Sequence, residues 1–241
     1  MSDWAILLAA GRGERLGSGL AKQWLDVDGR RAVDRVVNTA SAVVDGTVLV
    51  LPPGARWDGP PVHAVAVGGA TRAQSVRAGL ALVPDEADVV IVHDAAHPLA
   101  SAALFQAVVH RVRAGADAAV CVLPMTQVVQ VVRAGRIVSV LPKDGQVLAQ
   151  SPAAFRAGVL RAAHATAPES TEDVALVVAA GGRVVAVWGE SVNLHVTTPS
   201  EWWMANSLAT AMRRSGTGPL SCDSSPSSHS ASARDPEQGH N

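Results

Sequence analysis

The residues best suited to chemistry form a glycine-rich segment near the N-terminus. Residues 9–16 read Ala-Ala-Gly-Arg-Gly-Glu-Arg-Leu and directly follow the apolar run Trp4–Leu8, which is typical of a buried strand. Glycines after a parallel strand let backbone N–H groups approach a polyanion with no Cβ in the way. Arg15, and Lys22 seven residues later, would supply the positive charge that a phosphate chain requires. The segment therefore indicates an enzyme that handles nucleotides.

Two common phosphate-binding motifs do not fit this segment. A dinucleotide-binding G-x-G-x-x-G would need glycine at the position of Leu16, and the acidic residue expected after the second apolar run is replaced by Pro52-Pro53. A Walker A loop needs Gly-Lys followed by Ser or Thr, whereas this chain has Lys22-Gln23. The remaining alternative is a tight surface loop with solvated cations. The paired cations of the segment favour phosphate binding over that alternative.

The composition is that of a globular chain without bulk charge. Its 241 residues are 48% hydrophobic, enough for a full core, and the net charge is −1. This balance predicts neither a nucleic-acid partner nor a membrane surface. Two cysteines, Cys121 and Cys222, provide no disulfide framework, and no basic leader precedes the first apolar run. We therefore expect a cytoplasmic protein.

Short apolar runs alternate with helical patterns along the chain. The predicted strands are Trp4–Leu8, Thr47–Leu51, Ala64–Val67, Val89–Val92, Ala118–Leu123 and Arg183–Trp188. The predicted helices are Ala32–Val43, Arg72–Leu82, Ala102–Ala114, Ala153–Ala163, Thr171–Ala180 and Pro199–Arg213. Strands that are apolar throughout are typical of a parallel sheet covered on both faces, so we expect an α/β fold with a Rossmann-like layered sheet that is mostly parallel. Ligands bind such sheets at the C-terminal strand ends, where the glycine segment and His93-Asp94 fall.

Two regions depart from this alternation. Residues 125–149 mix short apolar pieces with turn signals, which predicts a projecting β arm. The apolar residues of the arm have little to pack against in their own chain, so we expect the arm to form a homodimer. Residues 215–241 are rich in Ser, Pro, Gly and His, which predicts a disordered tail after a domain of residues 1–214.

Five motifs occur in an order and spacing that resemble the methylerythritol phosphate cytidylyltransferase family of isoprenoid biosynthesis. They are Ala9–Lys22, Gly68-Gly69-x-x-Arg72-x-x-Ser75, Val92-His93-Asp94-Ala95-Ala96-x-Pro98, Thr171-Glu172-Asp173 and Val192-Asn193-Leu194-x-Val196-Thr197-x-Pro199. The resemblance covers about residues 3–213. It implies a fold of the nucleotide-diphospho-sugar transferase type and transfer of CMP from CTP to a phosphorylated polyol, with Mg²⁺ bound and pyrophosphate released.

The resemblance also implies roles for individual residues on the nucleotide side. Arg15 and Lys22 match the catalytic pair that stabilises the pentacoordinate α-phosphate and the leaving pyrophosphate. Such chemistry needs positioning and charge neutralisation more than covalent help. The matched nucleotide-binding residues are Ala9, Ala10, Gly11, Gly13, Gly69 and Ser75. We expect the Ser75 hydroxyl to hydrogen-bond the base edge.

A second group of residues matches the acceptor side. They are Asp94, His97, Lys143, Thr171 and His195, and Asp94 also matches the metal side, with Mg²⁺ held mainly by the CTP phosphates. Structural alternatives remain open for three residues. Asp94 at a strand end is also typical of a helix cap, Thr171 of a plain N-cap, and Arg72 of a solvated cation in the first turn of a helix. For Arg72 the family match favours a structural or nucleotide-side role.

The acceptor half departs from the family pattern at several positions. His97 stands where arginine is usual, His195 where lysine is usual, and Lys143 where the arm carries arginine. Gln127-Val128 replace Asp-Thr, and Ser151-Pro152-Ala153 replace Thr-Pro-Gln. A neutral imidazole holds a phosphate less strongly than a cation does. Three hypotheses follow: the methylerythritol enzyme itself, the same CTP chemistry on another polyol phosphate or a phosphonate, or a pseudoenzyme that binds nucleotide without turnover.

Overall fold

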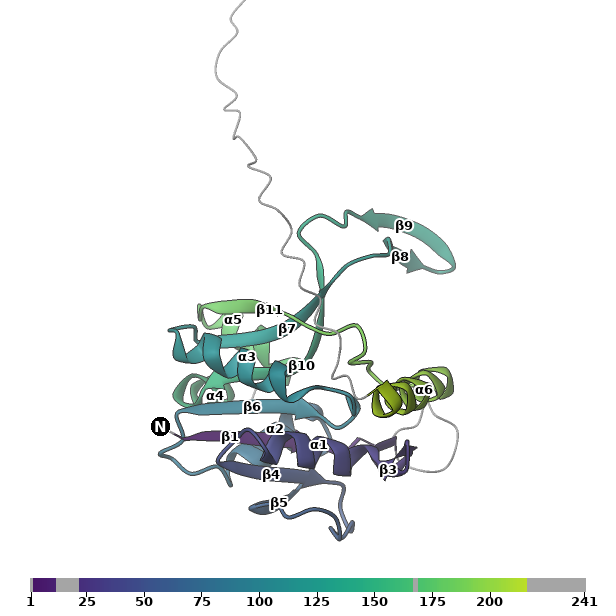
Figure 1. Cartoon of the computed structure of the whole chain (residues 1–241). Coiled ribbons are helices and arrows are strands. Elements are labelled where there is room, and N and C mark those ends of the chain that lie inside the picture. Colours follow the sequence, from purple (N-terminus) through teal and green to yellow (C-terminus); the bar gives the residue numbers. More distant parts are fainter. Residues whose placement is uncertain (1, 12–21, 167–168, 216–241) are drawn as a thin grey trace, which may run out of the picture.

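A computed structural model describes residues 2–11, 22–166 and 169–215 of the chain. Its centre is a seven-stranded sheet with the strand order β11-β7-β10-β6-β1-β4-β5 (Figure 1). The strands are β1 Asp3–Leu8, β4 Gly46–Leu51, β5 Ala64–Val67, β6 Val89–Asp94, β7 Ala118–Pro124, β10 Val147–Arg156 and β11 Val184–Trp188. Within this sheet β10 runs antiparallel to its neighbours β6 and β7, and the other pairings are parallel. The predicted α/β fold with a mostly parallel sheet is confirmed.

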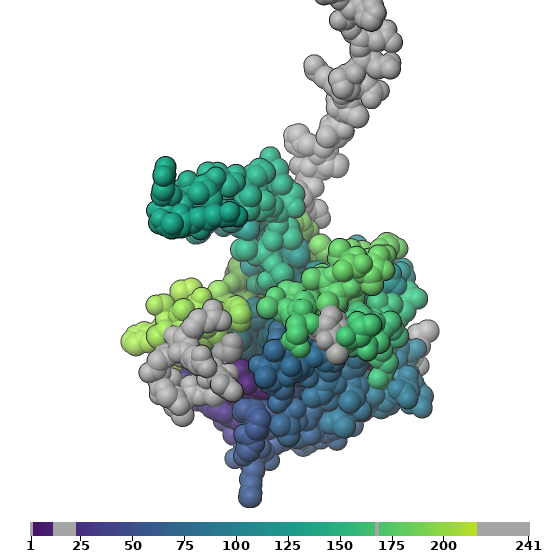
Figure 2. Space-filling model, turned by 180° about the vertical axis from the view of Figure 1, so that it is seen from behind, coloured from purple at the N-terminus to yellow at the C-terminus, as the bar shows by residue number. Residues whose placement is uncertain are grey.

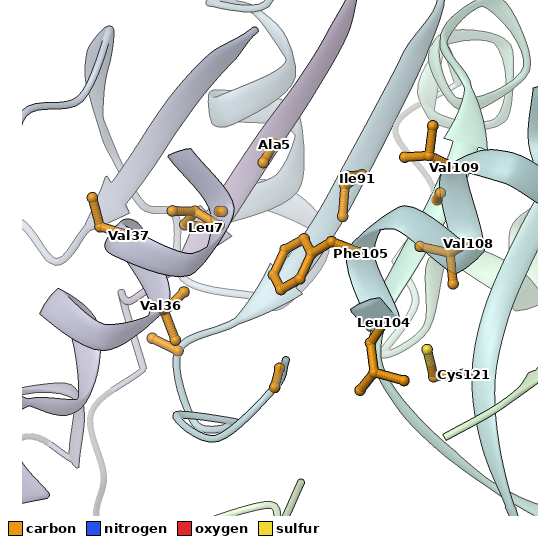
Figure 3. Packing of buried hydrophobic residues seen from close by; sticks show 14 of the residues in the cluster. Ala5, Leu7, Val36, Val37, Ile91, Leu104, Phe105, Val108, Val109 and Cys121 are labelled. Carbon is orange, nitrogen blue, oxygen red and sulfur yellow. The ribbon is translucent and has the colours of Figure 1, made fainter. Parts of the chain in front are cut away.

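Helices cover both faces of this sheet because successive strand residues point to opposite sides. Helices α1 (Ala32–Ser41) and α3 (Ala102–Arg113) lie in front of the sheet in Figure 1. Their cluster takes Ala5 and Leu7 from β1, whereas α2, α4 and α5 share a cluster with Ile6 and Leu8. The helices on that second face are α2 Arg72–Leu80, α4 Ala157–His164 and α5 Asp173–Ala179. Figure 3 shows Phe105 of α3 pointing toward Ile91 of β6 in the first cluster.

One predicted helix begins too early. The helical pattern over Ala153–Ala163 is wrong for its first four residues, which form the end of β10. Ala154 and Phe155 pair with Ile91 and Val90 of β6 and are fully buried. These residues lie between β6 and β7 and pair with both strands. Strand pairing and burial at this position outweigh the preference of alanine for helix. The start of β10, residues 147–149, likewise pairs with β7 and belongs to the main sheet, although the sequence assigned it to the arm.

The predicted arm is a two-stranded hairpin of β8 (Val129–Arg133) and β9 (Arg136–Leu141). Ala134 and Gly135 form its two-residue turn and both have positive φ, 48° and 75°, as a type I′ hairpin requires. The hairpin stands away from the body of the molecule in Figures 1 and 2. Its apolar side chains are exposed in this chain, namely Val132, Ile137, Val138, Val140 and Leu141. A projecting arm is thus confirmed, and its role in dimerisation stays a prediction.

The remaining elements pack beside the main sheet. They are the short helix η2 (Lys22–Trp24), the hairpin β2 (Asp26–Val27) with β3 (Arg30–Arg31), and α6 (Pro199–Ser215). Helix α6 packs on the hairpin through Ala205, Ala209 and Val27, and the Trp202 indole N–H donates to the Asp26 carbonyl (2.7 Å). Apart from Ser215, which ends α6, the predicted tail lies outside the described residues. None of the helices in the described part of the chain combines the length and apolar character needed to cross a membrane.

Candidate functional site

A cavity of about 480 Å³ opens at the carboxyl ends of the parallel strands. Strands β1 and β6 are neighbours in register, with Leu8 opposite Asp94, so the loops that follow them meet at one edge of the sheet. The sequence-predicted site residues that line this cavity are Ala9, Ala10, Gly11, Gly69, Ser75, Asp94, Thr171 and His195. The structure therefore brings five of the six predicted nucleotide residues and three of the five predicted acceptor residues to a single place.

Besides His97, which lies behind His195 and is described below, four predicted residues do not line the described cavity. Gly13 and Arg15 lie outside the described residues, and Lys22 begins η2 with its side chain outside the description. Lys143 lies exposed beyond the arm hairpin and does not line the cavity. Its predicted role concerns the acceptor of a neighbouring subunit, so the roles of these four residues stay predictions.

The predicted nucleotide side of the cavity, called the slot below, is lined by the small residues Ala9, Ala10, Gly69 and Ser75. A Cβ on Gly68 would overlap the Cβ of Ala10, and it would also approach Ser75 Oγ to 3.1 Å. The Ser75 hydroxyl accepts the Gly69 N–H (3.2 Å) and donates to the Thr71 carbonyl (3.0 Å). The hydroxyl proton of Ser75 is therefore used in a hydrogen bond within the turn. One lone pair of its oxygen stays available to accept a hydrogen bond from a donor on a base edge. The slot suits a flat ring that contacts backbone atoms.

The turn before α2 is built by local side-chain bonds. The Thr71 hydroxyl caps the helix by accepting the Gln74 N–H (3.2 Å), and the Gln74 side chain accepts the Ala70 N–H (2.9 Å). Such caps satisfy donors that the first turn of a helix leaves unpaired. They hold residues 69–75 in the wall of the cavity, with Arg72 in the first turn of the helix.

Asp94 is held from two directions at the end of β6. Its backbone N–H donates to Ser151 Oγ (2.9 Å), and its carboxylate Oδ1 lies 3.6 Å from Arg72 Nε. Arg72 Nη1 lies 2.6 Å from the buried Asp173 Oδ2. The interpretation of Arg72 as a merely solvated cation is therefore wrong. Burial of the guanidinium opposes its charge, but Asp94 and Asp173 outweigh that effect and raise the pKa of Arg72.

The three residues of the motif Thr171-Glu172-Asp173 occupy different positions in the structure. Glu172 precedes the first helical residue, Asp173, so Glu172 and not Thr171 occupies the N-cap position. Thr171 is exposed and faces the cavity, which agrees with a place near the acceptor. Glu172 also lines the cavity and was missed as a site residue. Desolvation raises the pKa of Glu172 against the influence of Arg72, and the charges of Asp94 and Asp173 add to the rise.

His97 and His195, the two residues that replace usual family cations, lie face to face. Their ring centroids are 4.7 Å apart and the planes are nearly parallel, at 8°. His97 is buried behind the exposed His195, and its Nδ1 donates to the Asn193 carbonyl (3.2 Å), because a carbonyl can only accept. Desolvation, with a contribution from the charge of His195, lowers the pKa of His97 to about 4. His97 is therefore neutral at neutral pH, with Nε2 free of a proton.

His93 is a site residue that sequence reasoning noticed only as the neighbour of Asp94. It is fully buried, its Nε2 donates to the His97 carbonyl (3.3 Å), and its Nδ1 accepts from Ser151 Oγ (2.8 Å). Burial lowers the pKa of His93 to about 3, so the ring is neutral; with its proton on Nε2 for the carbonyl, Nδ1 is left to accept. His93 thus orients the hydroxyl that binds the Asp94 backbone. No local pattern identifies such a role, because Ser151 lies 58 residues away.

Gln23 is a second residue whose position only the structure reveals. It lines the cavity and is 1% exposed, yet neither its amide nitrogen nor its amide oxygen has a hydrogen-bond partner among the described residues. A buried amide without partners is costly, since folding removes its bonds to water. From the sequence, Gln23 was noted only because Lys22-Gln23 does not fit a Walker A loop.

Comparison with known proteins agrees with this geometry. The model of the 2-C-methyl-D-erythritol 4-phosphate cytidylyltransferase family (IspD) matches residues 4–211. The chain is 37% identical over 212 residues to the protein of that name from Rhodococcus jostii, covering 85% of this chain and 93% of the relative. The crystal structure of the protein of that name from Thermus thermophilus aligns with a TM-score of 0.73 and 30% identity, over 86% of this chain and 98% of that chain.

Some relatives are longer. The chain is 42% identical over 231 residues to the bifunctional enzyme IspD/IspF of Anaeromyxobacter dehalogenans, which covers 88% of this chain but 58% of the relative. The chain thus spans little more than half the length of such relatives. A match that runs from β1 into α6, together with the same fold in a solved relative, means that this chain belongs to the 2-C-methyl-D-erythritol 4-phosphate cytidylyltransferase family.

Proposed function

We propose that the chain transfers CMP from CTP to 2-C-methyl-D-erythritol 4-phosphate and releases pyrophosphate. The observation that carries this proposal is the cavity itself. Its small-residue slot at Gly69 and Ser75 and its polar side at Asp94, Thr171 and His195 lie within one volume of about 480 Å³. A base and an acceptor bound on these two sides would place the reacting phosphates between them. Family membership over residues 4–211 supports the same reaction.

In this reaction an oxygen of the acceptor phosphate attacks the α-phosphorus of CTP. The new P–O bond forms as the bond from the α-phosphorus to the bridging oxygen breaks, and pyrophosphate leaves with that oxygen. Protein groups contribute by aligning the two phosphates and by neutralising charge in the transition state. We assign the charge neutralisation to Arg15 and Lys22, the cations of the glycine-rich segment and its continuation into η2.

A magnesium ion fits the donor groups on the acceptor side. Mg²⁺ is commonly bound by one or two carboxylates together with substrate phosphates, and Asp94 and Glu172 both line the cavity. Within the described residues no group of three or more His, Cys, Asp or Glu forms a metal site. We propose that the ion would be held mainly by the CTP phosphates, with Asp94 as its protein ligand. When bound, it would neutralise phosphate charge in the transition state.

The assembly we propose is a homodimer formed through the β8–β9 arm. The exposed apolar residues of the hairpin support this, since an isolated two-stranded ribbon is marginal in water. In such a dimer Lys143, close to the hairpin, would reach the acceptor of the neighbouring subunit. Deleting residues 127–143 should then yield a monomer in light scattering, and a dimer that survives the deletion would contradict this assembly. A cytoplasmic location stays a prediction from the sequence.

The test of the activity is pyrophosphate release from CTP with a panel of acceptors. The panel contains 2-C-methyl-D-erythritol 4-phosphate, ribitol phosphate and simple phosphonates, and UTP and ATP replace CTP in parallel reactions. We expect the highest kcat/KM with CTP and the methylerythritol phosphate. A higher value with another acceptor would overturn the proposed substrate. Stabilisation by CTP without release from any acceptor would instead indicate a binding protein without turnover.

A further inference from the structure

Four ionisable side chains form a continuous line from the interior of the protein to the cavity. His164 Nε2 lies 2.9 Å from Asp173 Oδ1, and the other oxygen of Asp173 lies 2.6 Å from Arg72 Nη1. Arg72 Nε in turn lies 3.6 Å from Asp94 Oδ1. His164 and Asp173 are almost completely buried, whereas Arg72 and Asp94 are partly exposed at the cavity. The line joins α4, α5, α2 and β6.

The inner end of this line has a fixed charge state. Burial opposes ionisation of Asp173, but the hydrogen bond from His164 and the charge of Arg72 outweigh it and lower the pKa of Asp173. The carboxylate is therefore ionised and accepts from both partners. Each of its oxygens has a separate donor, which defines the orientation of the carboxylate plane. Asp173 is a rigid anchor for the guanidinium.

Two nitrogens of the Arg72 guanidinium face different carboxylates. Nη1 is bound to the anchor inside, and Nε faces Asp94 at the cavity. A guanidinium is planar and rigid, so holding Nη1 at Asp173 limits the directions in which Nε can point. The backbone of Asp94 is held separately by Ser151, and this leaves Arg72 to restrain the carboxylate.

We propose that Arg72 is a positioning residue that sets the carboxylate of Asp94 for the phosphorylated acceptor, and that Asp173 and His164 act through it. This inference rests on the proposed function, in which Asp94 lies on the acceptor side. Among the described residues, Arg72 is the link between Asp173 and Asp94, so we expect the effect of the line on acceptor binding. The slot on the predicted nucleotide side is held instead by hydrogen bonds among Ser75, Gly69 and Thr71.

The first test is steady-state kinetics of Asp173→Asn with CTP and 2-C-methyl-D-erythritol 4-phosphate varied separately. Asparagine keeps the volume of the side chain but loses the charge and one acceptor oxygen. We expect KM for the acceptor to rise about tenfold, a typical coupling for groups in contact, with KM for CTP within about twofold of the parent. A purely structural role would lower the folded fraction, so kcat would fall while both KM values stayed constant.

Asp3→Asn is the matched control. Asp3 is also a buried carboxylate paired with an arginine, at 2.8 Å from Arg113. It is the first residue of β1 and so lies at the amino end of the strand, whereas the cavity lies at the carboxyl ends. Only Asp173→Asn should raise KM for the acceptor. An equal rise in the two variants would show that the loss of any buried carboxylate, and not positioning, causes it.

The route through Arg72 is tested by a double-mutant cycle. In an Arg72→Gln background, Asp173→Asn should cause no further rise in KM for the acceptor. Independent, additive effects would overturn the proposed route. His164 provides a milder variant in case Asp173→Asn folds poorly. His164→Gln, whose amide N–H can still donate to Asp173, should keep KM near the parental value, and His164→Leu should raise it.

A crystal structure of Asp173→Asn separates this inference from the proposed function. We expect the distance from Arg72 Nε to Asp94 Oδ1 to open from 3.6 Å beyond ion-pair contact. If the parent enzyme used none of the acceptors, the proposed function would fail while the structural readout remained valid. An unchanged Arg72–Asp94 distance in the variant would refute the positioning role, whatever the acceptor.

Discussion

Acidification from pH 7 to pH 5 should destabilise this protein through two buried neutral histidines. The pKa of His93 is lowered to about 3 and that of His97 to about 4, in both cases chiefly by desolvation. The unfolded chain takes up protons near the ordinary pKa of 6.5, while the folded chain takes them up only at much lower pH. Between these values the unfolded state binds more protons, so the free energy of unfolding falls as the pH falls.

The magnitude follows from the proton linkage at each histidine. Between pH 7 and pH 5 each histidine lowers the free energy of unfolding by about 2 kcal/mol, and the two together lower it by about 4 kcal/mol. Burial raises the pKa of Asp3 and Glu190, so these groups offset part of the loss. Asp173, whose pKa is lowered, loses its contribution only below this pH range. Against a typical total stability of about 5–15 kcal/mol, the net loss is easily measured.

The assay is urea unfolding at pH 7, 6 and 5, followed by tryptophan fluorescence and circular dichroism. His93→Gln should remove about half of the pH-dependent loss, since glutamine does not titrate and can still bond Ser151 and the His97 carbonyl. His110→Gln, a change at an exposed histidine of α3, is the control and should keep the full loss. Equal free energies of unfolding at pH 7 and pH 5, or a parental slope in His93→Gln, would refute the reasoning.

Three substitutions test other parts of the structure. Phe105→Ala removes a ring that is 1% exposed and should lower the free energy of unfolding by about 4 kcal/mol in urea titrations; a loss below about 1 kcal/mol would contradict its place in the core. Gly68→Ala should weaken CTP-induced thermal stabilisation because its Cβ overlaps Ala10, whereas Gly158→Ala in α4, which meets no atom within 4 Å, should not change it. Gln23→Leu should leave the free protein at least as stable as the parent, because it removes a buried amide without partners among the described residues, and should reduce turnover. A destabilised Gln23→Leu protein would show that the amide has a partner in the free state.

Much of the fold was predictable because its signals are local. The apolar runs of β1, β4, β6 and β7 are continuous in the sequence, and such runs indicate a sheet covered on both faces. The placement of the cavity followed from a general rule, that ligands bind at the carboxyl ends of parallel strands. The position of Asp94 at that edge therefore needed no coordinates, whereas Gly69 and Ser75 were expected there from the family resemblance.

The errors and omissions arise where distant segments determine the outcome. Residues 153–156 are helical by composition but complete the sheet between β6 and β7, which the local sequence does not contain. The sequence left Arg72 open between a solvated cation and a structural or nucleotide-side role, because its partner Asp173 lies 101 residues away. The same separation in sequence concealed the contact between Ser151 and His93.

The sequence by itself determined which residues are candidates for the chemistry and which strands precede them, because residue type and hydrophobic period are properties of neighbouring positions. Tertiary structure alone decided the state of those residues. It made His97 neutral behind His195, oriented Ser151 through His93, and anchored Arg72 on Asp173. The physical reason is that desolvation and ion pairing depend on what the rest of the chain places around a group, and no local pattern specifies that environment.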